Sequence, residues 1–208
     1  ASLSFALMGT PSSWAVNPSG GFTYEIPFRL PPGIAEVKPK ISLIYSSQSG
    51  NCLAGVGWGL SGLSAINRCP RTFVNDGFRG GVNIDANDRL CLDGQRLILT
   101  AGTYGAEGAS YSTEIYNGAR IVGTALAGTS STRTFKVYTK AGELMEYTPF
   151  SDASGTVALQ FLLSRVTDAK GNYWQAYYQS NTATGEVYPK AICYTGNSRV
   201  AQTPKNCI

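Results

Sequence analysis

Apolar and polar residues alternate with a period of two along much of this chain, which is the pattern of half-buried β-strands. Residues 22–30 alternate strictly, and the apolar members of this segment share one side: Phe22, Tyr24, Ile26, Phe28 and Leu30. Pro27 lies on the other side and predicts a sheet edge or a bulge, because proline cannot donate to a strand ladder. Residues 40–46 alternate again, so we expect these two segments to pair.

Three later stretches have the form of β-hairpins, with turn-forming residues between two alternating segments. Asp93-Gly94 suits the positive φ angles of a type I′ turn between residues 90–92 and 95–99. The other two turns are predicted at residues 140–142 and 168–172. Since no segment longer than about ten residues has helical periodicity, the pattern predicts an all-β fold. It would consist of antiparallel sheets built from hairpins, as a β-sandwich or a segment of a curved shell, with negligible helix.

Composition agrees with short strands and narrows the class of protein. Glycine (24) and tyrosine (12) are abundant in 208 residues, which favours tight turns and β-structure over helix. We expect a single β domain over 1–208, since no linker-like segment divides the chain. The net charge of +4 is small and the basic residues do not cluster, which argues against nucleic-acid binding. No apolar run approaches the roughly 18 residues that a membrane span needs.

The side chains that common enzyme sites require are missing or badly spaced. The chain has no histidine, which excludes Ser-His-Asp and Cys-His catalysis and histidine metal sites. Glu143 and Glu146 would project to opposite faces of a strand. Asp85, Asp88 and Asp93 do not form a calcium loop, because Arg89 occupies a position that needs an oxygen ligand, and they are better explained as turn residues. The sequence therefore predicts no catalytic residue, no metal and no cofactor.

Two aromatic features have alternative interpretations. The glycine cluster at 55–59 lacks the strand–glycine–helix context of a dinucleotide loop, so we expect its glycines to let the backbone pass beneath a buried Trp58, with Leu60, Leu63 and Ile66 as neighbours.

Farther along, one strand carries three large rings, with Trp174 and Tyr178 on one face and Tyr177 on the other. Exposed rings here would bind a sugar or a protein partner, as in an adhesin or a glycan-binding β-sandwich. The alternative is that these rings fill a core.

Five cysteines without zinc-type spacing indicate disulfides and an oxidising compartment. Cys193 and Cys207 lie at the two ends of a polar stretch that has few apolar residues to hold it in place. These two cysteines are therefore candidates to form a disulfide. The residues alone do not show which two of the remaining cysteines, Cys52, Cys69 and Cys91, form a second disulfide.

Two sequence blocks resemble a known family. The first spans residues 55–69 and the second, Asp-Arg-Leu-Cys-Leu-Asp-Gly-Gln-Arg-Leu, spans 88–97. Together they resemble the SpvB-like domain at the front of bacterial Rhs and insecticidal-toxin-complex B proteins, over residues 10–197. In the first block the motif residues are Gly55, Gly57, Trp58, Gly59, Leu60, Ser61 and Arg68.

The resemblance implies a structural function. In this family the domain contributes β-sheet to a shell that packages a toxic C-terminal segment, so the expected partners are downstream Rhs/YD-repeat segments of the same protein, together with a toxin-complex partner or a host surface. The hairpin over residues 161–178 resembles one YD repeat. The expected location is secreted or at the bacterial cell surface. The family also implies a disulfide between Cys69 and Cys91, which leaves Cys52 free or bridging two chains.

Overall fold

The computed structural model describes residues 11–85, 87–125, 133–151, 158–181 and 183–208. Contacts divide the chain into two compact units. The N-terminal unit comprises residues 1–31 and 39–63, and the barrel unit comprises residues 32–38 and 64–208. A single folding domain over 1–208 stays a prediction, because a division by contacts does not measure whether the two units unfold together.

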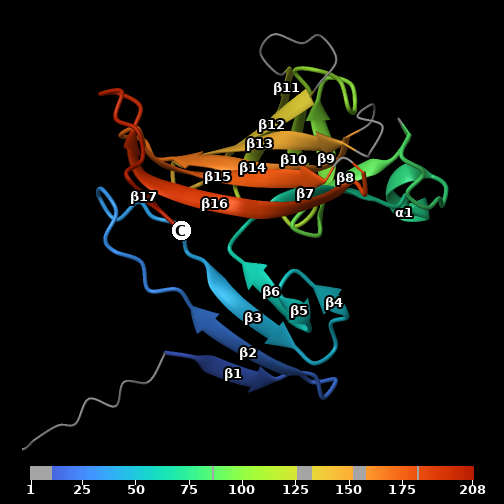
Figure 1. Cartoon of the computed structure of the whole chain (residues 1–208). Coiled ribbons are helices and arrows are strands. Elements are labelled where there is room, and N and C mark those ends of the chain that lie inside the picture. Colours follow the sequence, from blue (N-terminus) through green and yellow to red (C-terminus); the bar gives the residue numbers. More distant parts are fainter. Residues whose placement is uncertain (1–10, 86, 126–132, 152–157, 182) are drawn as a thin grey trace, which may run out of the picture. The chain divides into compact units, whose positions relative to one another are not determined.

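The N-terminal unit is built on a four-stranded antiparallel sheet in the order β1-β2-β3-β6 (Figure 1). The predicted pairing of residues 22–30 with 40–46 is confirmed, with Ile26 opposite Leu43. The expectation that Pro27 marks an edge strand or a bulge was wrong, since β2 lies between β1 and β3. Pro27 is tolerated because it is the last residue of β2, beyond Glu25, where the pairing with β1 ends. The strands of this unit are β1 (Ser13–Val16), β2 (Phe22–Pro27), β3 (Ser42–Ser46), β4 (Asn51–Cys52), β5 (Gly55–Val56) and β6 (Trp58–Ser61).

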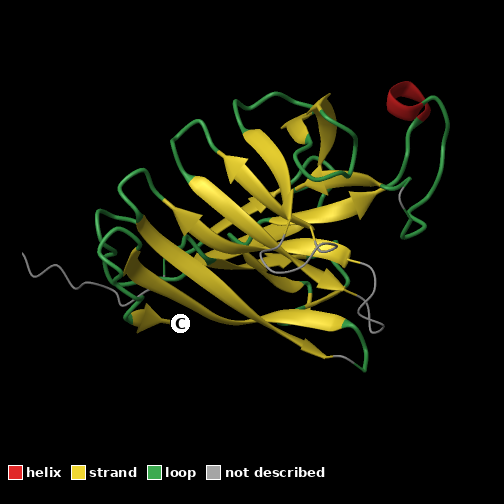
Figure 2. Ribbon diagram, turned by 90° about the horizontal axis from the view of Figure 1, so that it is seen from above, coloured by secondary structure: helices red, strands yellow, loops and turns green. Residues whose placement is uncertain are grey.

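The barrel unit contains eight antiparallel strands that close on themselves (Figure 2). Neighbouring strands run in the order β13-β12-β11-β10-β9-β8-β7-β14, and β14 pairs back with β13, which closes the ring. Closure removes both open edges of the sheet. The strands are β7 (Ala65–Cys69), β8 (Arg89–Leu92), β9 (Gln95–Ala101), β10 (Ser110–Thr113), β11 (Arg120–Ala125), β12 (Arg133–Tyr138), β13 (Leu144–Ser151) and β14 (Ala158–Thr167).

Strand β14 is also a branch point. On the edge away from β13, its middle pairs with β7, where Phe161 lies opposite Ile66. Its last residues pair instead with β15 (Asn172–Asn181), where Val166 lies opposite Trp174. The sheet therefore continues out of the barrel through β15, β16 (Glu186–Asn197) and β17 (Asn206–Cys207).

The barrel is filled by inward-facing apolar and aromatic side chains. Phe135 is 1% exposed, and its ring lies 4.8 Å from that of Phe161 and 6.2 Å from that of Tyr111, between ring centroids. This core forms because the period-two pattern turns alternate residues of every strand inward. Other core side chains exposed by 2% or less are Ile66, Leu97, Ile121, Val137, Tyr147 and Leu163.

The all-β antiparallel fold and the low helix content are confirmed. Within the described ranges the helical element is α1 (Phe73–Asp76), which is too short to cross a membrane. The hairpin turn at Asp93-Gly94 is confirmed by φ angles of 48° and 81°. The hairpins at 140–142 and 168–172 are confirmed by the pairing of β12 with β13 and of β14 with β15. The closed barrel was not among the two architectures predicted, because its closing contact joins β13 to β14 around a ring that no local pattern encodes.

Candidate functional site

The two sequence blocks meet in space across strands β7 and β8. Arg68 lies opposite Leu90, and Cys69, which is disulfide-bonded to Cys91, lies opposite Arg89. Arg68 also forms an ion pair with Asp88, with 3.0 Å between Nη1 and Oδ2. The Asp88 side chain is fully buried, and burial alone would raise the pKa of its carboxyl group. Hydrogen bonds from the Asn83 amide and from Arg68 outweigh this effect and lower the pKa.

A second buried carboxylate, Asp76, binds both arginines of the second block. Arg89 Nε donates to Asp76 Oδ1 at 2.6 Å, and Arg96 donates to Oδ2. The side chains of Asp76 and Arg96 are 4% and 7% exposed. Arg96 also donates to the Pro70 carbonyl at 3.0 Å. Burial would raise the pKa of Asp76, but hydrogen bonds from the Thr72 amide and the two arginines lower it overall. The role of Asp76 is not predictable from the sequence, because an aspartate between two motifs carries no signal of its partners.

The remaining acidic residue of the second block, Asp93, is exposed and is bound by neutral donors instead of arginine. Its carboxylate accepts hydrogen bonds from Ser64 Oγ at 2.5 Å and from the Ala65 amide at 2.9 Å. Ser64 Oγ is hydrogen-bonded in turn to the hydroxyl of Tyr147 at 2.8 Å. Among the residues that the structure describes, no group of three or more His, Cys, Asp or Glu side chains could hold a metal ion. The end of the first block in β7, the second block and Asp76 therefore form a structural junction, which we call the buried junction. The side chains of Asp76 and Asp88 are buried in it, and all three carboxylates are bound by protein donors.

The structure contains the two disulfides expected from the sequence. Cys69 is bonded to Cys91, with 6.0 Å between the Cα atoms, and Cys193 is bonded to Cys207, with 4.1 Å between the Cα atoms. Cys52 is a free, exposed thiol in β4. The first disulfide ties β7 to β8 inside the junction, and the second ties β17 to β16.

We expect non-reducing peptide mapping to find these two crosslinks and an alkylated Cys52. Closing each loop of 14 to 22 residues should stabilise the fold by about 3 kcal/mol on the chain-entropy estimate. The double variant Cys193→Ala/Cys207→Ala should therefore lose roughly this amount of free energy of unfolding, whereas Cys52→Ala should change it little. A crosslink between Cys52 and Cys69 within one chain would contradict the assignment.

Trp58 occupies a different environment from the one expected. It is half-buried, not buried, because it lies on the open four-stranded sheet of the N-terminal unit. Its ring centroid lies 5.2 Å from that of Tyr45 and 6.4 Å from that of Tyr24. Ile66, expected as a neighbour, is a core residue of the barrel unit. The backbone at Gly57 does pass close to an aromatic ring, since its φ is +77° and a Cβ atom would lie 2.6 Å from the ring of Tyr45. That ring is not the one expected, which was Trp58.

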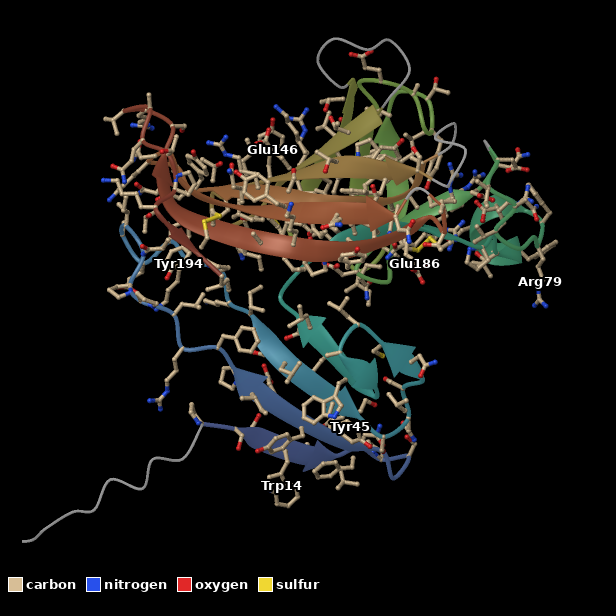
Figure 3. All side chains as sticks on the ribbon, in the orientation of Figure 1. Trp14, Tyr45, Arg79, Glu146, Glu186 and Tyr194 are labelled. Atoms are coloured by element: carbon tan, nitrogen blue, oxygen red, sulfur yellow. A yellow bond between two sulfur atoms is a disulfide. The ribbon has the colours of Figure 1, made fainter. Side chains whose placement is uncertain are left out.

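Trp58 belongs to an aromatic row that crosses the whole sheet. Residues directly opposite one another on adjacent strands point to the same face, and the register places four large aromatics in line: Trp14, Tyr24, Tyr45 and Trp58. Trp14 and Tyr45 are labelled in Figure 3. Neighbouring positions on this face are also apolar: Val16, Phe22, Ile26, Leu43 and Leu60. We call these nine residues the aromatic face. None is buried, and Trp14 is 70% exposed.

The three candidate binding aromatics of β15 are separated by the structure. Trp174 is 7% exposed and therefore cannot contact a ligand at this surface. Tyr178 is half-buried, its hydroxyl donates to the Leu163 carbonyl at 2.8 Å, and burial raises its pKa to about 12. Tyr177 is 47% exposed. The division of faces stays a prediction with which these exposures agree, and Tyr177 is the accessible ring of the three.

Comparison with known proteins confirms the resemblance to SpvB. The family model described as the Salmonella virulence plasmid 65kDa B protein, SpvB, matches residues 16–75, a segment that contains the first sequence block. None of the curated protein sequences matches the chain.

Solved structures with the same fold include a Tc holotoxin and an effector protein. The crystal structure of TcdB2-TccC3 has a TM-score of 0.75 at 19% identity, over 94% of this chain and 11% of that one. The Photorhabdus luminescens Tc holotoxin pore has a TM-score of 0.69 at 19% identity, over 89% of this chain and 10% of that one. The N-terminal domain of effector protein SpvB from Salmonella typhimurium strain LT2 has a TM-score of 0.62 at 20% identity, over 86% of this chain and 65% of that one. The chain thus spans about a tenth of the toxin chains that share its fold.

Proposed function

We propose that this chain is a non-catalytic structural domain of an exported Rhs or toxin-complex-type protein, and that it contributes β-sheet to a shell that packages a C-terminal toxin. Its partners would be downstream Rhs/YD-repeat segments of the same protein, with a toxin-complex partner or a host surface in contact with the assembled shell. The protein would be secreted or held at the bacterial cell surface.

The aromatic face carries this proposal. Nine apolar side chains occupy one face of a four-stranded sheet, and none of them is buried. Contiguous apolar patches on this scale are uncommon on soluble proteins and mark surfaces that bind a partner. A sheet face is flat and is ordinarily covered by a second sheet, packed about 10 Å away. We therefore infer that another β-sheet covers this face in the complete protein.

The occupant that the comparisons favour is a later part of the same polypeptide. The matched toxin chains are about ten times longer than the matched segment, so each contains a large remainder that could supply such a sheet. The matched structures are themselves parts of larger Tc toxin assemblies, one of them a holotoxin pore.

The buried junction supports a structural role over a catalytic one. Asp76, Asp88 and Asp93 are bound by arginine, serine and backbone donors, which leaves them poorly suited to act as general acids or bases.

Self-association of the isolated chain tests the proposal. With the aromatic face uncovered, we expect concentration-dependent oligomers in light scattering. Trp14→Ser/Phe22→Ser should weaken this association about tenfold or more, since large aromatics dominate interface energies. The matched control is Val74→Ser, because Val74 is 91% exposed and lies in α1.

A downstream segment of the parent protein, added in equimolar amount, should bind the chain and suppress its self-association. A chain that stays monomeric at high concentration and does not bind that segment would contradict the proposal.

A further inference from the structure

An open groove of about 520 Å³ crosses the outer surface of the barrel unit. Its floor is formed by strands β12 to β15, where a row of polar side chains lies in cross-strand register: Lys136, Glu146, Arg165 and Gln175. These residues point outward, because Phe135 and Tyr147, which alternate with Lys136 and Glu146, are in the barrel core. Glu146 is labelled in Figure 3. The volume lies within the range of small-molecule sites.

Arg165 is a cation without a counter-ion at the centre of this groove. Glu146 is its cross-strand neighbour, but the Glu146 carboxylate pairs with Lys136, with 3.4 Å between Nζ and Oε1. The Arg165 side chain makes no ion pair or hydrogen bond with any residue in the described ranges, and its Nε is buried without a partner. Because Nε is buried, a ligand in the groove cannot reach it. The Nη nitrogens of Arg165 are not among the buried unpartnered atoms, so they are the donors that can bind an anion from outside.

The position of Arg165 is fixed by what lies beneath it. Its guanidinium lies 3.5 Å from the ring centroid of Tyr173. Tyr173 is 8% exposed and packs over Gly196, where a Cβ atom would lie 2.3 Å from the tyrosine ring. A β-bulge at Ser164 adds an extra residue to β14 immediately before Arg165, and bulges commonly redirect a side chain next to a binding site. The cation is therefore preorganised.

The other groups of the groove are hydroxyls, an amide and an exposed ring. Ser164 and Thr148 lie beside Arg165 on β14 and β13. Gln175 donates a hydrogen bond to the hydroxyl of Tyr177, which holds this 47% exposed ring at the rim of the groove. Tyrosine offers an apolar face and a polar tip, which suits a ligand with both kinds of surface.

The groove lies on a sheet face, where backbone groups are already paired in the strand ladders. An extended peptide is usually recognised by main-chain bonds at an open strand edge, which this surface does not offer. A ligand here must bind side chains through its own hydroxyls and one anionic group. We propose that the groove binds an acidic saccharide, with a sugar carboxylate on Arg165 and a sugar ring against Tyr177.

Binding of sialyllactose and digalacturonate to the 208-residue chain, followed by ligand-observed NMR and calorimetry, tests the proposal. Lactose is the neutral comparison, and a penta-glutamate peptide is the comparison for anions in general. We expect both acidic saccharides to bind at least about tenfold more tightly than lactose or penta-glutamate, because a charge-assisted bidentate bond adds to the hydroxyl contacts.

Three variants locate the site. Arg165→Gln and Tyr177→Ser should each weaken binding of the acidic saccharides, Arg165→Gln by about 10- to 100-fold. Lys205→Gln, which removes the same charge from an exposed position just before β17, should leave binding unchanged. Since Arg165→Gln could disturb folding, the exposed Tyr177→Ser and a shift of the Gln175 side-chain amide on binding provide independent readouts.

The proposal would be overturned if no acidic saccharide binds, if lactose or penta-glutamate binds equally well, or if a folded Arg165→Gln variant binds as the parent does.

Discussion

Asp76→Ala should destabilise the protein by about 3–5 kcal/mol, the range for removing one partner of a buried ion pair. Asp76 is the only carboxylate bound by Arg89 and Arg96 within the described residues, and the Arg96 side chain is 7% exposed. Without Asp76, the Arg96 guanidinium would remain buried with the Pro70 carbonyl as its acceptor. Chemical denaturation at pH 7 measures the loss.

The effect of Asp76→Ala should depend on pH in a defined direction. The pKa of Asp76 is lowered in the folded state, so its contribution to stability is present above the ordinary carboxyl pKa of about 4 and is lost as the pH falls through the folded-state value. The free-energy difference between parent and variant should therefore be largest near neutral pH and should narrow below about pH 4.

Glu107→Ala is the matched control for this substitution, because Glu107 is an exposed carboxylate elsewhere in the barrel unit. It should change the stability by no more than about 0.5 kcal/mol. An Asp76→Ala variant that unfolds like this control would contradict the stabilising role assigned to the ion pairs of Asp76 with Arg89 and Arg96.

Phe135→Ala should cost about 3–5 kcal/mol, the range for truncating a large aromatic in a close-packed core. Phe135 is 1% exposed and contacts rings from β10 and β14, so its removal leaves a cavity between opposite sides of the barrel. Since we predict that residues 1–208 fold as one domain, amides of β2 and β3 should lose protection from hydrogen exchange together with those of the barrel.

Phe73→Ala is the control for the core substitution, because Phe73 is 66% exposed in α1 and its removal creates no cavity. Its effect should stay within about 0.5 kcal/mol. Equal losses for Phe73→Ala and Phe135→Ala would contradict the assignment of Phe135 to the core.

Local patterns in the sequence predicted the strands and turns well. Alternation identified the pairing of β2 with β3, and Asp93-Gly94 identified a hairpin, because both features depend on neighbours within a few residues. The closure of β13 on β14 was not predictable in this way, since β14 presents one edge to β13 and shares the other between β7 and β15.

At the candidate sites, too, local features could be predicted from the sequence, whereas contacts between distant segments could not. The glycine cluster indicated a close backbone approach at Gly57, but not which ring would lie there, because Tyr45 is brought to it by strand register. Burial of Trp58 was wrongly expected, since a row of aromatics has the same sequence pattern whether its sheet face is covered or open. The partners of Arg68 and Arg96 could not be assigned, because Asp88 and Asp76 are reached through loops.

The central claim, that the aromatic face is covered by another sheet in the complete protein, is tested most directly by hydroxyl-radical footprinting. Trp14 and Phe22 are 70% and 39% exposed in this chain and should be oxidised readily when it is isolated. In the longer parent protein we predict that oxidation of both falls several-fold, while oxidation of Val74 in α1 does not change. Equal oxidation of Trp14 and Phe22 in the two proteins would contradict the account.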